Sequence, residues 1–232
     1  MRPVALAGIT KSGERTMRVF GTDYDGVIIN IEPEKAKAFG ELLADKWSVG
    51  SVEATEFWKK TGGSGRRSKF DYFYRQRFGK PISDEIYQQV GGEYSRLLKS
   101  AFYPKTRLLP YASENLQYAK ANFDYMFISS GVPMDEINEL ATLNGVADYF
   151  DVVLGTSSEY PSKREHFRKI IGEKKPEQMV FLADGLEDMR VAREFEVTAI
   201  GVTTNRQENE LWEAGATYVT DLAGVVNVLK SL

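Results

Sequence analysis

The chain has 232 residues, of which 42% are hydrophobic and 27% are charged, a composition typical of a folded globular protein rather than a disordered one. A formal net charge of -3 gives no electrostatic reason to expect a polyanionic partner, so we expect no nucleic-acid binding. Cysteine is absent and His166 is the single histidine, which excludes disulfides and cysteine chemistry and argues against a serine nucleophile served by a histidine base.

Residues 1–16 are interpreted as an N-terminal extension, because Met17 stands directly before the first strong strand pattern. The competing interpretation is a short edge strand from Val4 to Ile9. That apolar stretch is too short for a signal peptide, and no run approaches the roughly 18 apolar residues of a membrane span. We therefore expect a cytoplasmic protein with no membrane partner.

Short apolar runs with the pattern of buried strands recur along the chain, at residues 17–23, 125–130, 151–156, 179–184 and 197–202. Helix-like segments alternate with them at residues 133–144, 162–173, 187–195 and 206–214. This alternation predicts an α/β fold, a Rossmann-like doubly wound parallel sheet with helices on both faces. A last segment, 221–232, is expected to form a closing helix with Asp221 as its N-cap.

About a hundred residues separate the first predicted strand from the second, far more than the dozen or so that a crossover connection needs. Within this insertion the pattern is helical, with Pro33 at a first-turn position and Ser83 at the start of a later helix. We expect a mostly α-helical cap domain of about four helices at residues 33–104. The core domain then comprises residues 17–32 and 105–232.

Polar and charged groups collect where the predicted strands end. Ligands of open parallel sheets bind beyond the carboxyl ends of the strands, so these groups are expected to lie together. They are Asp23 and Asp25 after the first strand, Ser129 and Ser130 at the end of the second, Asp184 and Asp188 after the fourth, and Lys163 at the start of the helix after the third.

The same positions resemble the motifs of the haloacid dehalogenase superfamily, whose phosphatases carry four motifs in this order. The matching stretches are "DYDGV", "FISS", "SKREHF" with Lys163, and "FLADGLEDM". The resemblance extends from Met17 to the end of the chain, and it identifies the helical insertion with the family's C1-type cap. Two positions depart from the common pattern: Ala183 replaces a glycine, and Arg164 replaces the proline of many phosphoglycolate phosphatases.

The resemblance implies a hydrolase that works through an aspartyl-phosphate, with Asp23 as the nucleophile and Asp25 as the acid and base. Two carboxylates about 4 Å apart repel by roughly 4 kcal/mol at an effective dielectric near 20, so the cluster needs a cation. Hard oxygen ligands without histidine or cysteine favour Mg²⁺. The expected metal residues are Asp23, Asp25, Asp184 and Asp188, where Asp188 has the alternative role of holding the lysine. The expected phosphate-binding residues are Ser129, with Ser130 as its alternative, and Lys163. Lys163 is also expected to be catalytic, as a positive charge beside the nucleophile and the phosphate.

The cap contains a stretch rich in glycine, basic and aromatic residues, "KKTGGSGRRSKFDYFYRQRF" at 59–78. One interpretation is a flexible loop that brings Arg66, Arg67 or Lys69 over an anionic substrate. The other is an interhelix linker with a solvated basic face. The aromatic residues at helical spacing are expected in the cap core, namely Phe70, Phe73, Tyr74 and Phe78.

The sequence thus predicts a phosphatase for a small phosphorylated metabolite, such as a sugar phosphate or a phosphoglycolate-like compound. A phosphomutase of the beta-phosphoglucomutase type would keep all four motifs and is an alternative. A dehalogenase would need the nucleophile but no acid two residues later, so Asp25 argues against it. A non-enzymatic module would have lost a motif, and none is lost. His166 is interpreted as a packing or surface residue.

Overall fold

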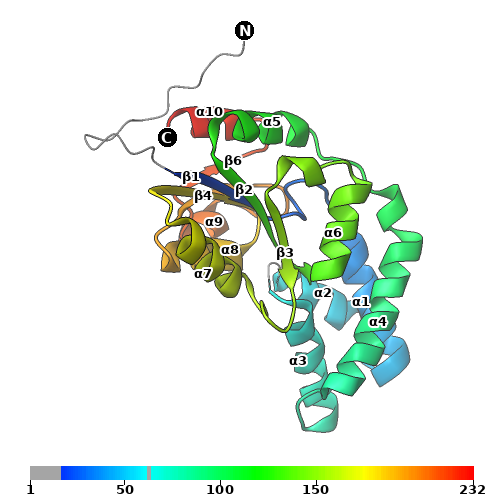
Figure 1. Ribbon diagram of the computed structural model, residues 1–232. Helices are drawn as coiled ribbons and strands as arrows, with labels where there is room; N and C mark the ends of the chain where they lie inside the picture. The colour runs from blue at the N-terminus through cyan, green and yellow to red at the C-terminus, as the bar shows by residue number, and fades with distance from the viewer. Residues whose placement is uncertain (1–16, 62–63) are drawn as a thin grey trace.

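The computed structural model describes residues 17–61 and 64–232, so the extension expected at residues 1–16 lies outside the described residues (Figure 1). The strands are β1 (Arg18–Thr22), β2 (Tyr125–Pro133), β3 (Val152–Thr156), β4 (Gln178–Ala183), β5 (Thr198–Val202) and β6 (Tyr218–Thr220). They form one parallel sheet in the order β3-β2-β1-β4-β5-β6. The predicted doubly wound α/β fold is confirmed. The strand β6 escaped prediction because its three half-buried residues are too few to show a pattern.

Helices of the core domain cover both faces of this sheet (Figure 1). They are α5 (Ala112–Asn122), α6 (Met134–Leu143), α7 (Lys163–Lys174), α8 (Leu186–Glu194), α9 (Glu208–Ala214) and α10 (Val225–Lys230), with short 3₁₀ turns η1 (Tyr103–Lys105) and η2 (Ala147–Tyr149). Successive strand residues point to opposite faces. Phe127 therefore packs with Phe167 of α7, while Ile128 belongs to the cluster that includes α5, α6 and α10.

The sequence analysis missed one helix and placed the start of another too early. The helix α5 was not predicted, because it begins after a left-handed residue, Tyr111, and has no side-chain cap to mark its start. The closing helix starts at Val225 rather than at Asp221. The carboxylate of Asp221 instead accepts a hydrogen bond from the backbone of Gly224 at 2.9 Å, so Asp221 caps a turn before the helix.

The long segment between β1 and β2 folds, within the described residues, into α1 (Glu32–Trp47), α2 (Ser51–Lys60), α3 (Arg66–Phe78) and α4 (Asp84–Ala101). Pro33 lies in the first turn of α1, and Ser83 caps α4 by accepting a hydrogen bond from Ile86 N. Aromatic rings fill the space between these helices: the ring of Phe39 lies 4.9 Å from Trp58 and 5.0 Å from Phe70, centroid to centroid. Of the aromatic residues expected in the cap core, Phe70, Phe73 and Tyr74 are buried, whereas Phe78 is 46% exposed.

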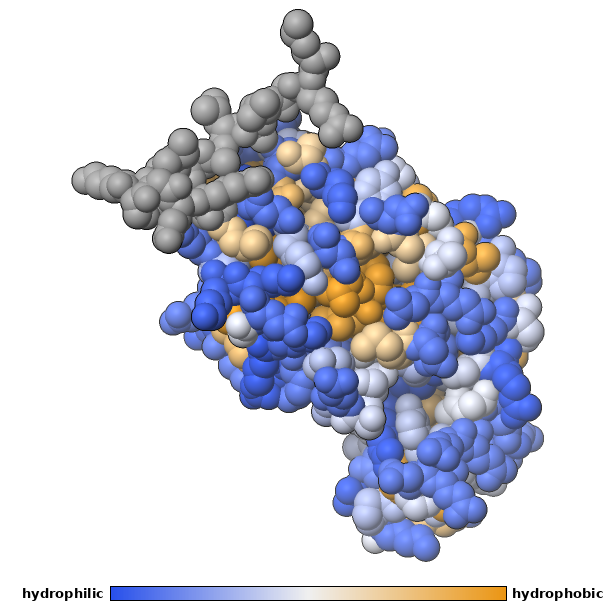
Figure 2. All heavy atoms as spheres, in the orientation of Figure 1, coloured by the Kyte–Doolittle hydropathy of each residue, from blue (hydrophilic) through white to orange (hydrophobic). Residues whose placement is uncertain are grey.

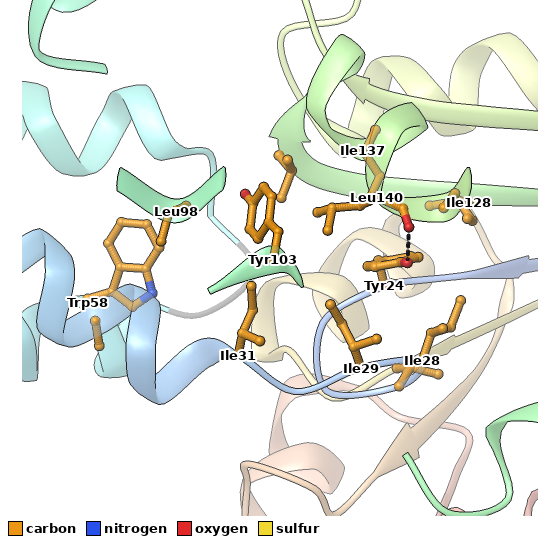
Figure 3. Packing of buried hydrophobic residues seen from close by; sticks show 14 of the residues in the cluster. Tyr24, Ile28, Ile29, Ile31, Trp58, Leu98, Tyr103, Ile128, Ile137 and Leu140 are labelled. Atoms are coloured by element: carbon orange, nitrogen blue, oxygen red, sulfur yellow. Dashed lines mark hydrogen bonds between the residues drawn. The ribbon is translucent and has the colours of Figure 1, made fainter. Parts of the chain in front are cut away.

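One hydrophobic cluster runs from the sheet into the helical insertion (Figure 3). It extends from Ile128 on β2 through Tyr24 and Tyr103 to Trp58 on α2, and the hydroxyl of Tyr24 donates to the carbonyl of Leu140 at 3.0 Å. This shared packing fixes the cap helices over the carboxyl edge of the sheet.

The surface of the helical insertion is mostly hydrophilic on the face drawn in Figure 2, and apolar side chains gather in the middle of the remaining part of the molecule on that face. Across residues 17–61 and 64–232, no helix has the length and apolar character needed to cross a membrane.

Candidate active site

Asp23 and Asp184 follow neighbouring strands at the carboxyl edge of the sheet and line the same cavity. Asp23 follows β1 directly and Asp184 follows β4, the neighbouring strand, and the Asp23 backbone N–H donates to the carbonyl of Leu182 at 2.8 Å. The strand β1 lies between β2 and β4, where the chain order of the sheet reverses, which is the usual place for a ligand in such folds.

A tight turn after Asp25 depends on Gly26. Its φ of +75° is in the left-handed region, and its backbone N–H donates to the carbonyl of Ile29 at 2.7 Å. A Cβ atom at this position would lie 2.1 Å from a carboxylate oxygen of Asp184. Glycine is therefore required both for the turn and for the close approach of the first and fourth motifs.

Lys163 links two of the predicted carboxylates. It is the first residue of α7, where Ser162 caps the helix, and its Nζ lies 2.9 Å from Asp23 Oδ2 and also contacts Asp188 Oδ1. Burial alone would lower the pKa of Lys163, but the two carboxylates raise it above its usual value, so the lysine is cationic. Asp188 is fully buried and holds this lysine, which was the alternative role expected for it.

Asp25 is paired with a lysine that sequence reasoning missed. Lys35, on α1, contacts Asp25 Oδ2, and its Nζ lies 3.6 Å from Glu32 Oε1. Burial raises the pKa of Asp25 to about 6, and Lys35 opposes this rise. In the sequence Lys35 looks like any solvated helix lysine, yet it is only 3% exposed. Asp25 is thus a buried carboxyl group whose pKa lies above that of an ordinary aspartate.

The two serines that end the second motif point to different sides. Ser130 lines the cavity next to Asp23, whereas Ser129 is fully buried and its Oγ lies 2.8 Å from His166 Nδ1. His166 Nε2 lies 3.0 Å from the carbonyl of Gly155, which can only accept, so Nε2 carries the proton and Ser129 donates to Nδ1. The geometry favours Ser130 over Ser129 for contact with a phosphoryl group, and His166 joins β2 to β3 as a packing residue.

We predict that His166 makes stability depend on pH in the acidic range. Burial is the main cause that lowers the pKa of His166, to about 4 from an unfolded value near 6.5. The unfolded chain therefore binds this proton first, and the contribution of about 3 kcal/mol, present above pH 6.5, is lost as the pH falls towards 4. Denaturant unfolding of the wild type and of His166→Asn should show a stability gap that shrinks by about 2–3 kcal/mol between pH 7.5 and 4.5. A gap independent of pH would contradict a neutral buried His166.

The three basic cap residues predicted for substrate contact have different positions. All three belong to the first turn of the helix α3, so they lie neither in a flexible loop nor in an interhelix linker. Arg66 and Lys69 are buried and line the cavity with Asp23, while Arg67 lies at the outer surface over the ring of Tyr87. Arg67 therefore lies apart from the cavity that Asp23 lines.

Arg66 is already engaged by side chains of α6 and α4. Its guanidinium donates to both carboxylate oxygens of Glu136, on α6, at 2.8 and 3.0 Å, and to Ser95 Oγ at 2.7 Å. Glu136 also accepts from the hydroxyl of Tyr103 at 3.0 Å. The glutamate was not expected from the sequence, because nothing local marks a partner 70 residues away.

Two cavities meet at Asp23, Asp25 and Glu32. The first, of about 40 Å³, lies between the sheet edge and the cap helices α2 and α3. The second, of about 210 Å³, extends past Asp184 to Asn205, and the Asn205 amide donates to Asp184 Oδ2 at 2.6 Å. Asn205 follows β5 and was also missed, since a single asparagine in a loop has no distinguishing pattern.

The acidic residues fit a cation of the Mg²⁺ type at Asp23 and Asp184. Burial raises the pKa of Asp184 well above its usual value, and the charge of Asp23 raises it further, which is a repulsion that a cation would relieve. Within the described part of the chain, no three acidic or histidine side chains are arranged to hold a metal by themselves. Mg²⁺ needs no such cage, because it commonly binds one or two carboxylates together with water and substrate phosphate.

The comparisons with known proteins identify the family of this chain. Residues 17–196 match the family model described as haloacid dehalogenase-like hydrolase. The chain belongs to this family. It is 22% identical over 192 residues to a phosphoglycolate phosphatase from Mannheimia succiniciproducens, which spans 80% of this chain and 85% of the relative.

Solved structures of haloacid dehalogenase-like hydrolases share the fold. A predicted phosphatase from Clostridium acetobutylicum superposes with a TM-score of 0.76 at 18% identity, covering 94% of this chain and 99% of that chain. A haloacid dehalogenase-like family hydrolase from Streptococcus pneumoniae superposes with a TM-score of 0.72 at 18% identity, covering 92% and 98%. The coverage of both chains shows that the fold of these hydrolases includes the helical insertion.

Proposed function

We propose that this hydrolase is a Mg²⁺-dependent phosphatase that cleaves a phosphomonoester of a small metabolite through an aspartyl-phosphate at Asp23. The observation that carries the proposal is the position of Asp23 at the meeting point of two cavities, 2.9 Å from the cation of Lys163. An anionic nucleophile is repelled by a phosphate unless cations surround both, and the buried lysine supplies that charge.

Each step uses a side chain of this site. Asp23 attacks phosphorus while Asp25 donates a proton to the leaving alkoxide, and Asp25 then takes a proton from the water that hydrolyses the phosphoenzyme. The pKa of Asp25, raised to about 6 by burial, suits a group that must carry both protonation states near neutral pH. Lys163 and Ser130 hold the phosphoryl oxygens. Asp23 and Asp184 would hold Mg²⁺, which would supply positive charge that screens the phosphate.

The proposed substrate class rests on the small size of the first cavity and on the relative described as a phosphoglycolate phosphatase. A volume of about 40 Å³ holds only a few water-sized groups, so a compact leaving group fits best. By this limit a phosphoglycolate-like compound fits better than a sugar phosphate, whose leaving group is larger.

The test is release of inorganic phosphate from para-nitrophenyl phosphate and from a panel of small phosphorylated metabolites. We expect turnover with added Mg²⁺, loss of turnover with a chelator, and recovery when Mg²⁺ is restored. Turnover that does not change when the chelator is added would contradict the proposed requirement for Mg²⁺. Conversion of one sugar phosphate into another without phosphate release would identify a mutase instead.

A further inference from the structure

Four cationic side chains line the first cavity, and three of them are paired with carboxylates. Lys163 is paired with Asp23 and Asp188, Lys35 with Asp25 and Glu32, and Arg66 with Glu136. The fourth cation, Lys69, forms no ion pair and no side-chain hydrogen bond with any residue in the described part of the chain. Its Nζ lies 3.9 Å from the centroid of the Trp58 ring, and the residue is 4% exposed.

A buried ammonium without a carboxylate partner is unfavourable, because burial removes water and nothing replaces it. The ring of Trp58 compensates only in part. Burial lowers the pKa of Lys69 to about 8, and the nearby charges of Lys35 and Arg66 act in the same direction. The acidic group that opposes this effect most, Glu32, is already engaged by Lys35 and by the indole N–H of Trp58 at 2.9 Å.

The surroundings of Lys69 match the position of a substrate's leaving group. Asp23 and Lys163, from the core domain, mark where the phosphoryl group would react, and Lys69 lines the same cavity from the cap helix α3. Whatever part of the substrate lies away from Asp23 towards the cap therefore meets an unpaired cation.

We propose that Lys69 binds a second anionic group, a carboxylate or a phosphate, on the leaving group of the substrate. This inference rests on the proposed phosphatase function, because it assigns the phosphoryl group to the Asp23 side of the cavity. The substrates are then phosphomonoesters that carry an acid function near the ester. Neutral phosphomonoesters leave Lys69 buried and unpaired, so the site selects against them.

The kinetic test compares kcat/KM for three compact phosphomonoesters in the presence of Mg²⁺. These are 2-phosphoglycolate with a carboxylate, ethylene glycol bisphosphate with a second phosphate, and 2-hydroxyethyl phosphate with a neutral end. We expect the wild type to prefer at least one acidic substrate over the neutral one, and Lys69→Met to reduce that preference by about 10- to 100-fold. Lys69→Arg, which keeps the charge, should retain part of the preference, and the two acidic substrates show which anion is recognised.

Lys60→Met is the matched control, since Lys60 is an exposed lysine of the neighbouring helix α2 and lines neither cavity. It should leave the preference unchanged. An equal loss for acidic and neutral substrates in Lys69→Met, or a wild type that shows no preference, would overturn the assignment to Lys69. Absence of turnover for all three substrates in the folded wild type would instead contradict the proposed function.

Binding of a non-hydrolysable pair keeps the two questions separate. Phosphonoacetate carries a carboxylate, and 2-oxopropylphosphonate has a neutral group of the same shape. Calorimetric titration should show tighter binding of phosphonoacetate to the wild type, and Lys69→Met should remove that difference. An unchanged difference in the variant would refute the role of Lys69, whether or not the protein turns over a phosphomonoester.

Discussion

Replacing Asp23 by asparagine is expected to lower phosphate release by at least about 10,000-fold, because an amide cannot form the acyl-phosphate and the reaction then loses its nucleophile. The fold should survive, since asparagine has nearly the same shape and Lys163 keeps its contact with Asp188. The measurement is phosphate release in the presence of Mg²⁺, together with the midpoint of denaturant unfolding.

Asp45→Asn is the control for this substitution, because Asp45 is an exposed residue of α1 that lines neither cavity and should leave the rate unchanged. A companion variant, Asp25→Asn, keeps the nucleophile but lacks the group that activates water. It should accumulate phosphoenzyme that intact mass spectrometry detects when a substrate with a good leaving group is supplied. Substantial activity in Asp23→Asn would place the nucleophile elsewhere.

The part of the site on the strand ends was predictable from the sequence. Carboxyl ends of parallel strands share one edge, so two aspartates after β1 and one after β4 had to lie close together once the strand order was right. The structure places Lys163 against Asp23, as the spacing of the motifs suggested. Local patterns were sufficient here because each motif joins a buried strand directly to its functional group.

The partners of these residues were not predictable in the same way. Lys35 and Glu136 come from helices, and their contacts depend on how the cap packs on the core rather than on any local pattern. Strand alternation indicates that Ser129 and Ser130 point to opposite sides. Strand alternation does not indicate which of the two serines faces Asp23. The position of β2 in the sheet decides this, together with His166, which holds the Ser129 hydroxyl on the other side of the strand.

The ion pair between Arg66 and Glu136 is expected to contribute strongly to stability where the helical insertion meets α6. Both side chains are 4% exposed, and the pair joins α3 to α6. Removing the glutamate in Glu136→Ala leaves a buried arginine that cannot lose its proton, so we expect the free energy of unfolding to fall by about 3–5 kcal/mol. Urea unfolding followed by circular dichroism measures this loss.

A control on the same helix shows how much of the stability loss comes from the burial of the ion pair and how much comes from removing a negative charge. Glu139, also on α6, pairs with Lys99 of α4 at the surface, where exposed pairs contribute about 0–1 kcal/mol, so Glu139→Ala should cost little. The double variant Arg66→Met with Glu136→Leu should recover much of the stability that Glu136→Ala loses, because no buried charge is then left unpaired. If Glu136→Ala and Glu139→Ala lower the free energy of unfolding equally, a stabilising role for the buried ion pair between α3 and α6 is contradicted. If Glu136→Ala costs much more stability than Glu139→Ala, the guanidinium of Arg66 is held by Glu136 and is not free to bind substrate. Lys69, which has no ion-pair partner among the described residues, is then the cation of α3 that can bind the substrate.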